Sequence, residues 1–217
     1  MSTSLMERTA RREFPTPPLT TPIVFVVDDD ISVRESLEML LMYTGWRVET
    51  FACAREFLAR PRTNVASCLV LDVSLPDLDG LDLQKRVAVD RKEMPIIFIT
   101  GHGDIATSVR AMKAGAVEFL TKPVRDDVLV SAIRDAIDRS RTLLEREAEM
   151  RALRDCHASL SRREREVMAG VVTGRLNKQV AVALGITEIT VKAHRGRLMR
   201  KMRADSVADL VRMAVRL

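Results

Sequence analysis

Four short apolar runs in this chain each end in polar residues that could take part in chemistry. The residues that follow these runs are, in chain order, Asp28 and Asp29, Asp72, Thr100, and Lys122. Three carboxylates brought close together repel one another, so they favour a hard divalent cation with oxygen ligands, such as Mg²⁺. With a metal neutralising the oxygens of a phosphoryl group, Asp72 could attack phosphorus as a nucleophile. Lys122 would offer positive charge to the resulting acyl phosphate and Thr100 a hydroxyl donor, and the Lys122–Pro123 bond is a candidate for the cis form.

The runs themselves predict where these side chains lie. Each is a few apolar residues long and is bounded by turn signals, which is typical of a strand buried on both faces of a parallel sheet. The runs are Ile23–Val27, Cys68–Leu71, Ile96–Ile99 and Val117–Leu120. A single Asp at the end of a strand is more often a helix cap or a solvated turn residue. Four polar ends at the carboxyl edge of one sheet, where open α/β sheets place their chemistry, favour a site instead.

Helix-length segments with apolar residues at helical spacing separate the strands. These segments are Ser32–Thr44, Ala54–Ala59, Gly80–Val89, Ile105–Ala114 and Asp126–Ser140. Arg47–Phe51 alternates apolar and polar residues, which indicates a fifth strand at a sheet edge. Five strands alternating with five helices predict an α/β fold with a doubly wound parallel sheet. Right-handed crossovers, and acidic residues converging on the first and third strands, favour the order 2-1-3-4-5.

The composition is that of a globular protein whose charge is unevenly distributed. The 217 residues are 47% hydrophobic and 30% charged, which allows one or two domains with a substantial core. The net charge of +5 divides into +8 for residues 159–217 and −3 for residues 1–158. This asymmetry predicts an acidic module that binds cations and a basic module that binds polyanions.

Several features predict a cytoplasmic protein. No apolar run approaches the roughly 20 residues of a membrane span, so no membrane partner is expected. Residues 1–21 lack the apolar stretch of a secretory signal, and their Thr and Pro content indicates a disordered tail. The three cysteines, Cys53, Cys68 and Cys156, stand at wide spacings without a metal-ligand pattern, which favours buried thiols in a reducing compartment.

The chain changes character after residue 140. Residues 141–158 are charged, balanced and free of Gly and Pro, which indicates a solvated helical linker that continues the preceding helix; a short coiled-coil seam is the alternative. Ser161 and Glu164 form a capping box that opens a small all-α domain of four helices. The expected helices are Arg162–Thr173, Lys178–Leu184, Glu188–Met202 and Val207–Arg216. The three-residue turn containing Gly185 makes the second and third of these helices a helix-turn-helix. The chain is therefore expected to consist of a tail (1–21), an α/β domain (22–140), a helical linker (141–158) and a helix-turn-helix domain (159–217).

The second helix of the helix-turn-helix has one apolar stripe and one basic face. Val191, Leu198 and Met202 form the stripe that we expect to be buried. The opposite face carries Ile189, Lys192, Ala193, Gly196, Arg197 and Arg200, of which Lys192, Ala193 and Gly196 are suited to reading bases. The cations best placed for phosphates are Arg195, Arg197, Arg200 and Lys201. A basic helix face is equally compatible with a merely solvated surface.

Residues 22–140 resemble the receiver domain of two-component response regulators. The matching motifs are VVDDD, LVLDVSLPDLDG, ITGHGD, AMKAGAVEFL and TKP, in order and at family-like spacing. The resemblance implies that a sensor histidine kinase phosphorylates Asp72. It also implies that Asp28, Asp29 and Asp72 bind Mg²⁺ together with the backbone carbonyl of Ser74, and that Thr100 and Phe119 form a switch.

Leu160–Leu217 resembles the output domain of LuxR/FixJ-type regulators. The matching motifs are LSRREREVM, VVTGRLNKQVAVALGIT and ITVKAHRGRLMRKM; family recognition helices carry varied residues at the position of Gly196. Together the two resemblances imply a FixJ-like transcriptional regulator with no enzymatic activity beyond its own phosphorylation and dephosphorylation. Such a protein forms a homodimer when phosphorylated, binds double-stranded promoter DNA and acts with RNA polymerase.

Two other functions are alternatives to this one. Haloacid-dehalogenase-type phosphatases also form an aspartyl phosphate, with a D-x-D after the first strand that Asp28–Asp30 could mimic. Those enzymes need Thr or Val two residues after the second Asp and an acidic pair ending a later strand, whereas this chain has Ser32 and Thr100 at these places. A helix-turn-helix that contacts a protein is the second alternative, and the +8 charge of residues 159–217 argues against it.

Overall fold

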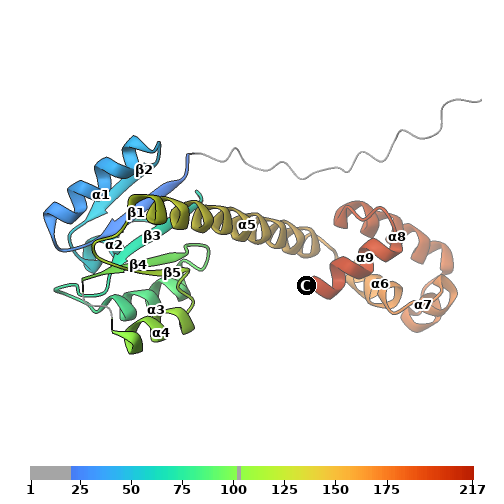
Figure 1. Ribbon diagram of the computed structural model, residues 1–217. Coiled ribbons are helices and arrows are strands. Elements are labelled where there is room, and N and C mark those ends of the chain that lie inside the picture. Colours follow the sequence, from blue (N-terminus) through green and yellow to red (C-terminus); the bar gives the residue numbers. More distant parts are fainter. Residues whose placement is uncertain (1–20, 102–103) are drawn as a thin grey trace, which may run out of the picture. The chain divides into compact units, whose positions relative to one another are not determined.

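The computed structural model describes residues 21–101 and 104–217 (Figure 1). The tail expected at residues 1–21 lies, apart from Thr21, outside the described residues. The chain forms two compact units, the first ending at Glu145 and the second beginning at Arg146. Each is described by itself below.

The first unit is built on a five-stranded parallel sheet with the order β2-β1-β3-β4-β5, as the sequence predicted. The strands are β1 (Ile23–Val27), β2 (Arg47–Phe51), β3 (Ser67–Asp72), β4 (Ile96–Thr100) and β5 (Glu118–Thr121). Every residue of β1, β3 and β4 is buried, whereas the edge strands β2 and β5 are partly exposed. Continuous Val, Ile and Leu runs suit the three central strands because helices cover both of their faces.

Among the described residues, five helices accompany the sheet. The first four have ends within one residue of the predicted ones, and the fifth continues through residues 141–158, the segment expected as a helical linker. The helices are α1 (Ile31–Tyr43), α2 (Ala54–Ala59), α3 (Gly80–Asp90), α4 (Ile105–Lys113) and α5 (Asp126–Ala158). Alternate strand residues face opposite sides of the sheet. Phe25 and Phe98 therefore pack with residues of α2, α3 and α4, while Val24 and Val70 pack with α1 and α5 (Figure 1).

The strand register brings the carboxyl ends of the strands to one edge. Val27 of β1 pairs with Leu71 of β3, so the next residues along each strand, Asp28 and Asp72, lie at the same level. Thr100 pairs with Thr121 at the ends of β4 and β5. The sheet therefore positions all four polar strand ends along one edge.

The helix α5 extends across the boundary between the units. Its residues Ile133 and Ile137 are fully buried in the core of the first unit, and Leu153 is buried in the core of the second. The segment 141–158, expected as a linker, is thus helical, and its last turns supply apolar side chains to the second unit. We propose that the second folding unit begins near Arg146 rather than at residue 159.

The second unit is all helical, with α6 (Arg162–Val172), α7 (Asn177–Leu184), α8 (Glu188–Met202) and α9 (Val207–Arg216). The predicted capping box is present. Glu164 N–H donates to Ser161 Oγ at 3.2 Å, and the Glu164 carboxylate accepts from Ser161 N–H at 2.8 Å. Lys201 Nζ, from the last turn of α8, lies 2.7 Å from Glu164 Oε2 and 3.0 Å from the Ser159 carbonyl oxygen. One buried carboxylate thus joins the start of α6 to the end of α8.

These contacts predict a pH-dependent contribution to stability. Hydrogen bonds from Lys201 and from Ser161 N–H lower the pKa of Glu164 from 4.5 to about 2. The lowered pKa means that the ionised carboxylate stabilises the folded unit fully above about pH 4.5, and that this contribution is lost as the pH falls towards 2. We expect Lys201→Met to reduce the free energy of unfolding of the second unit by about 1.5–3 kcal/mol at pH 7, and by less at pH 3.

A urea titration of the full-length protein, followed by the NMR methyl signals of Val167 and Leu198, measures this difference at both pH values. The matched control is Arg200→Met, because Arg200 is exposed and its Nε donates only weakly to its own helix, at 3.4 Å from the Gly196 carbonyl oxygen. An equal loss for both variants, or the same loss at pH 7 and pH 3, would contradict the assignment.

Candidate functional site

Three carboxylates meet at the carboxyl edge of the sheet, as predicted. One oxygen from each of Asp28, Asp29 and Asp72 lies within 4.8 Å of the others. Asp28 and Asp72 are buried, with 2% and 8% of their surface exposed, whereas Asp29 is exposed. The cluster is therefore open to solvent on the side of Asp29 and enclosed by protein on the other.

Lys122 joins two of these carboxylates. Its Nζ lies 2.7 Å from Asp28 Oδ2 and 2.7 Å from Asp72 Oδ2, and its backbone N–H donates to the Thr100 carbonyl oxygen at 2.8 Å. The Lys122–Pro123 bond is cis, as predicted. The sequence placed Lys122 beside Asp72, and the structure adds the contact with Asp28. The ammonium therefore balances charge at both buried carboxylates.

Burial and the contact between Asp28 and Lys122 shift the pKa values of both groups. Burial raises the pKa of Asp28 above its usual value, because it outweighs the hydrogen bonds from Lys122 and from Asp30 N–H. Burial alone would lower the pKa of Lys122, but its hydrogen bonds and ion pairs with Asp28 and Asp72 outweigh that effect and raise it. Lys122 therefore stays cationic at neutral pH.

The loop after β3 holds Asp72 through backbone contacts. Ser74 N–H donates to Asp72 Oδ1 at 3.1 Å, and Gly80 N–H donates to the Val73 carbonyl oxygen at 2.8 Å. A Cβ on Gly80 would lie 2.5 Å from the Asp72 carbonyl oxygen, so only glycine allows this close approach. The start of α3 can then pack directly beneath the end of β3.

Other acidic residues near the site cap helices. Asp30 accepts from Ser32 N–H and begins α1, and Asp79 accepts from Leu81 N–H and begins α3. Asp77 accepts from the backbone N–H groups of Ala54 and Arg55 at the start of α2. The sequence analysis did not identify Asp30, Asp77 or Asp79 as helix caps. Their position one residue before a helix was the available signal for Asp30 and Asp79.

Thr100 and Phe119 lie on adjacent strands. Thr100 is 1% exposed at the end of β4. Phe119 of β5 is half-buried and packs against the core, with its ring centroid 6.0 Å from that of Phe98. The arrangement gives Phe119 contact with the core on one side and solvent on the other.

The donor set of the cluster fits a hard divalent cation. The three Asp side chains offer only oxygen ligands, and together with Lys122 they leave about two net negative charges at the edge of the sheet. Carboxylate oxygens with open solvent access for water ligands are the usual environment of Mg²⁺. The residues present thus suit this ion.

The second unit exposes a basic face on α8. Val191, Leu198 and Met202 are buried, as predicted, and the exposed side of the helix carries Lys192, Ala193, Gly196, Arg197 and Arg200. Lys192 Nζ forms an exposed ion pair with Glu188 at 3.2 Å, which sequence reasoning did not anticipate.

Two of the predicted phosphate-binding cations make contacts inside the second unit. Arg195 is partly buried and donates from Nη1 to Asn177 Oδ1 of α7 at 3.0 Å. Lys201 binds Glu164, as described above. The structure therefore separates the basic residues of α8 into an exposed group and a group tied to neighbouring helices.

Comparisons with known proteins agree with this architecture. The model of the response regulator receiver domain matches residues 24–134, and that of the LuxR family of bacterial regulatory proteins matches residues 158–214. Nodulation protein W of Bradyrhizobium diazoefficiens is 53% identical over 195 residues, which cover 90% of this chain and 86% of that protein. The chain is a two-component response regulator of the LuxR/FixJ type.

Other response regulators resemble it over nearly the same length. The transcriptional regulatory protein FixJ of Bradyrhizobium diazoefficiens is 41% identical over 89% of this chain and 94% of that protein. The solved structure of the response regulator StyR superposes with a TM-score of 0.83 at 43% identity, covering 91% of this chain and 100% of that one. This response regulator therefore combines a receiver domain with a LuxR-type DNA-binding domain, an arrangement of transcriptional regulators rather than of enzymes.

Within residues 21–101 and 104–217 of the response regulator, none of the helices has the length and apolar character that a membrane crossing requires.

Proposed function

We propose that the receiver accepts a phosphoryl group on Asp72 from a sensor histidine kinase. The observation that carries the proposal is the position of Asp72 at the end of the central strand β3, between the ends of β1 and β4. Its carboxylate lies 2.7 Å from Lys122, with Asp28 and Asp29 on the β1 side and Thr100 at the end of β4 on the other. In the transfer, an oxygen of Asp72 forms a bond to phosphorus as the bond from phosphorus to the kinase histidine breaks.

The residues around Asp72 have distinct tasks in this step. Mg²⁺, held by Asp28, Asp29, Asp72 and the carbonyl of Ser74, would neutralise charge on the phosphoryl oxygens. Lys122 keeps its positive charge and turns from the Asp72 carboxylate to an oxygen of the acyl phosphate. Thr100 donates its hydroxyl to another phosphoryl oxygen. We infer no catalytic activity other than this self-phosphorylation and the subsequent dephosphorylation.

We further propose that phosphorylation produces a homodimer through α4, β5 and α5. A Thr100 side chain drawn towards the phosphoryl group leaves room for Phe119 to turn inward, which reshapes the surface of β5. Three residues of α4 at helical spacing, Ile105, Val109 and Met112, are 82%, 44% and 44% exposed. This apolar stripe suits contact with a second copy of the chain.

The output domain is proposed to bind promoter DNA in the cytoplasm through α8 and to act on transcription by RNA polymerase. Lys192, Ala193 and Gly196 lie on the exposed face where a base edge can be reached, and Arg197 and Arg200 lie on the same side of the helix for phosphates. Arg195 remains a proposed phosphate contact, with its guanidinium oriented by Asn177. Two output domains brought together by a two-fold dimer would read half-sites about one DNA turn, roughly 34 Å, apart or a multiple of it.

Asp72→Asn is expected to abolish phosphorylation because it keeps the shape of the site and removes the nucleophile. The measurement is uptake of label from a small-molecule phosphodonor in the presence of Mg²⁺. The matched control is Asp77→Asn, because Asp77 lies in the same loop and caps α2 instead of facing the cluster. Label retained by the Asp72→Asn protein would show that another residue is the acceptor.

Beryllofluoride, which mimics a phosphoryl group, is expected to double the mass of the protein in sedimentation at micromolar concentration. Val109→Lys should prevent this by placing charge in the proposed α4 interface, whereas Val89→Lys should not. Val89 makes a suitable control because it is an apolar residue of α3 that is 71% exposed outside the proposed face. An unchanged mass for the wild-type protein would rule out the dimer.

Lys192→Ala and Arg200→Ala are expected to weaken DNA binding in different ways. Lys192→Ala should cost roughly 1–3 kcal/mol and relax the preference at one base position. Arg200→Ala should weaken binding to all sequences about equally and reduce the salt slope by about one unit.

Binding to a matched and a mutated operator at several salt concentrations tests both variants. If Lys192→Ala weakened both sites alike while Arg200→Ala changed the base preference, the two assignments would be reversed. If neither variant mattered, the DNA-reading helix would lie elsewhere.

A further inference from the structure

The helix α4 is attached to the receiver by little buried surface. Of its nine residues only Thr107 and Ala111 are buried. Thr107 N–H and Oγ1 are both bonded to the carboxylate of Asp104, the residue that caps the same helix. The methyl group of Ala111 is therefore the part of α4 that enters the core. A short helix held in this way can shift at low free-energy cost unless something else fixes its position.

Gln84 of α3 provides a specific link to α4. Its side chain is 1% exposed, and its Nε2 donates to the Ala111 carbonyl oxygen at 3.0 Å. The same carbonyl accepts from Ala116 N–H at 3.1 Å, while Gly115 N–H donates to the Met112 carbonyl oxygen at 3.0 Å. These two backbone bonds, with Gly115 at φ +95°, form the Schellman motif that ends α4. Gln84 thus holds the end of α4 at the one residue whose side chain reaches the core.

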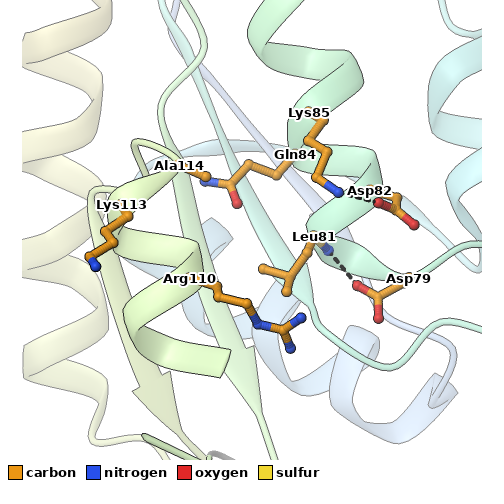
Figure 2. A pocket seen from close by; sticks show the side chains of 8 residues that line it. All are labelled: Asp79, Leu81, Asp82, Gln84, Lys85, Arg110, Lys113 and Ala114. Carbon is orange, nitrogen blue, oxygen red and sulfur yellow. Dashed lines mark hydrogen bonds and ion pairs between the residues drawn. The ribbon is translucent and has the colours of Figure 1, made fainter. Parts of the chain in front are cut away.

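The other end of the Gln84 amide is not satisfied in this arrangement. Its Oε1 is buried and has no hydrogen-bond partner among the described residues. Gln84 lines a groove of about 430 Å³ between α3 and α4, and Arg110 and Lys113 stand on the opposite wall (Figure 2). Among the described residues, the bond from Nε2 to the Ala111 carbonyl oxygen is therefore the hydrogen bond that the Gln84 amide makes.

The Arg110 side chain, by contrast, is bonded within α4. Its guanidinium lines the same groove and donates to Thr107 Oγ1 at 3.2 Å, on its own helix. The bond from Gln84 Nε2 to the Ala111 carbonyl oxygen thus joins α4 to α3 directly, whereas Arg110 bonds within α4.

We propose that Gln84 is a positioning residue that holds α4 in the unphosphorylated position and thereby sets how readily the receiver forms its dimer. This inference rests on the proposed function, because α4 supplies the apolar stripe of the proposed interface. The amide acts through the helix and not on the phosphoryl group.

Hydrogen exchange of the full-length protein without a phosphodonor tests the link directly. In Gln84→Met, which keeps the volume and removes both polar groups, the amides of Gly115 and Ala116 should exchange about three- to tenfold faster, the factor expected for one hydrogen bond. Gly45 and Trp46, whose N–H groups end α1 with the same motif, should be unchanged. The matched control is Lys85→Met, since Lys85 is the next residue of α3 and its side chain is 71% exposed.

The second measurement is the protein concentration at which beryllofluoride produces half-maximal dimer. Gln84→Met should lower this concentration about three- to tenfold, whereas Lys85→Met should leave it unchanged. Faster exchange at the ends of both α1 and α4 would indicate loss of general stability and would overturn the proposal, as would unchanged exchange at Gly115 and Ala116.

Two further cases have defined outcomes: a variant that does not fold and a wild-type protein that does not dimerise. If Gln84→Met does not fold, Gln84→Glu, which keeps the shape but has no N–H for the Ala111 carbonyl, carries the same expectation. If the wild-type protein does not dimerise, the proposed dimer fails, and the exchange of Gly115 and Ala116 still decides whether Gln84 holds α4.

Discussion

The receiver depends on the electrostatic balance between three carboxylates and one lysine. Asp28 and Asp72 are buried side by side at the edge of the sheet, and the ammonium of Lys122 lies 2.7 Å from both. Without that cation, two buried negative charges would face each other in a medium that screens them poorly. Because the lysine comes from the end of β5 and the aspartates from β1 and β3, the balance requires the observed strand order. The order of the strands therefore determines both the topology of the sheet and the charge balance of the site.

Much of this arrangement could be predicted because strand ends are visible in a sequence. Apolar runs that stop at Asp28, Asp72 and Lys122 place those residues at one edge once the sheet is parallel. The contact between Lys122 and Asp28 could not be predicted, since it depends on side-chain conformations that spacing does not specify. The burial of Asp28 beside an exposed Asp29 likewise follows from how α1 begins, at Asp30, rather than from the DDD motif itself.

The output domain shows the same division between local pattern and tertiary contact. Helical periodicity identified the buried stripe of α8 correctly, because it depends only on spacing along one helix. The partners of Arg195 and Lys201 are Asn177 and Glu164, which lie on other helices and 18 and 37 residues away in sequence. Net charge therefore overstates how many cations of α8 are free of contacts with neighbouring helices. Lys192 remains available, because exposed pairs such as that with Glu188 contribute little free energy.

The close approach of Gly80 to the end of β3 has a genetic consequence. One nucleotide change converts a glycine codon into an alanine codon, and the added methyl carbon would lie 2.5 Å from the Asp72 carbonyl oxygen. Such an allele would leave every carboxylate and the lysine in the coding sequence while displacing the strand end that aligns them. Strains that have lost the signalling response can therefore carry a gene in which every chemically active residue is intact. A sequence comparison limited to the acidic and basic residues would therefore classify that gene as functional.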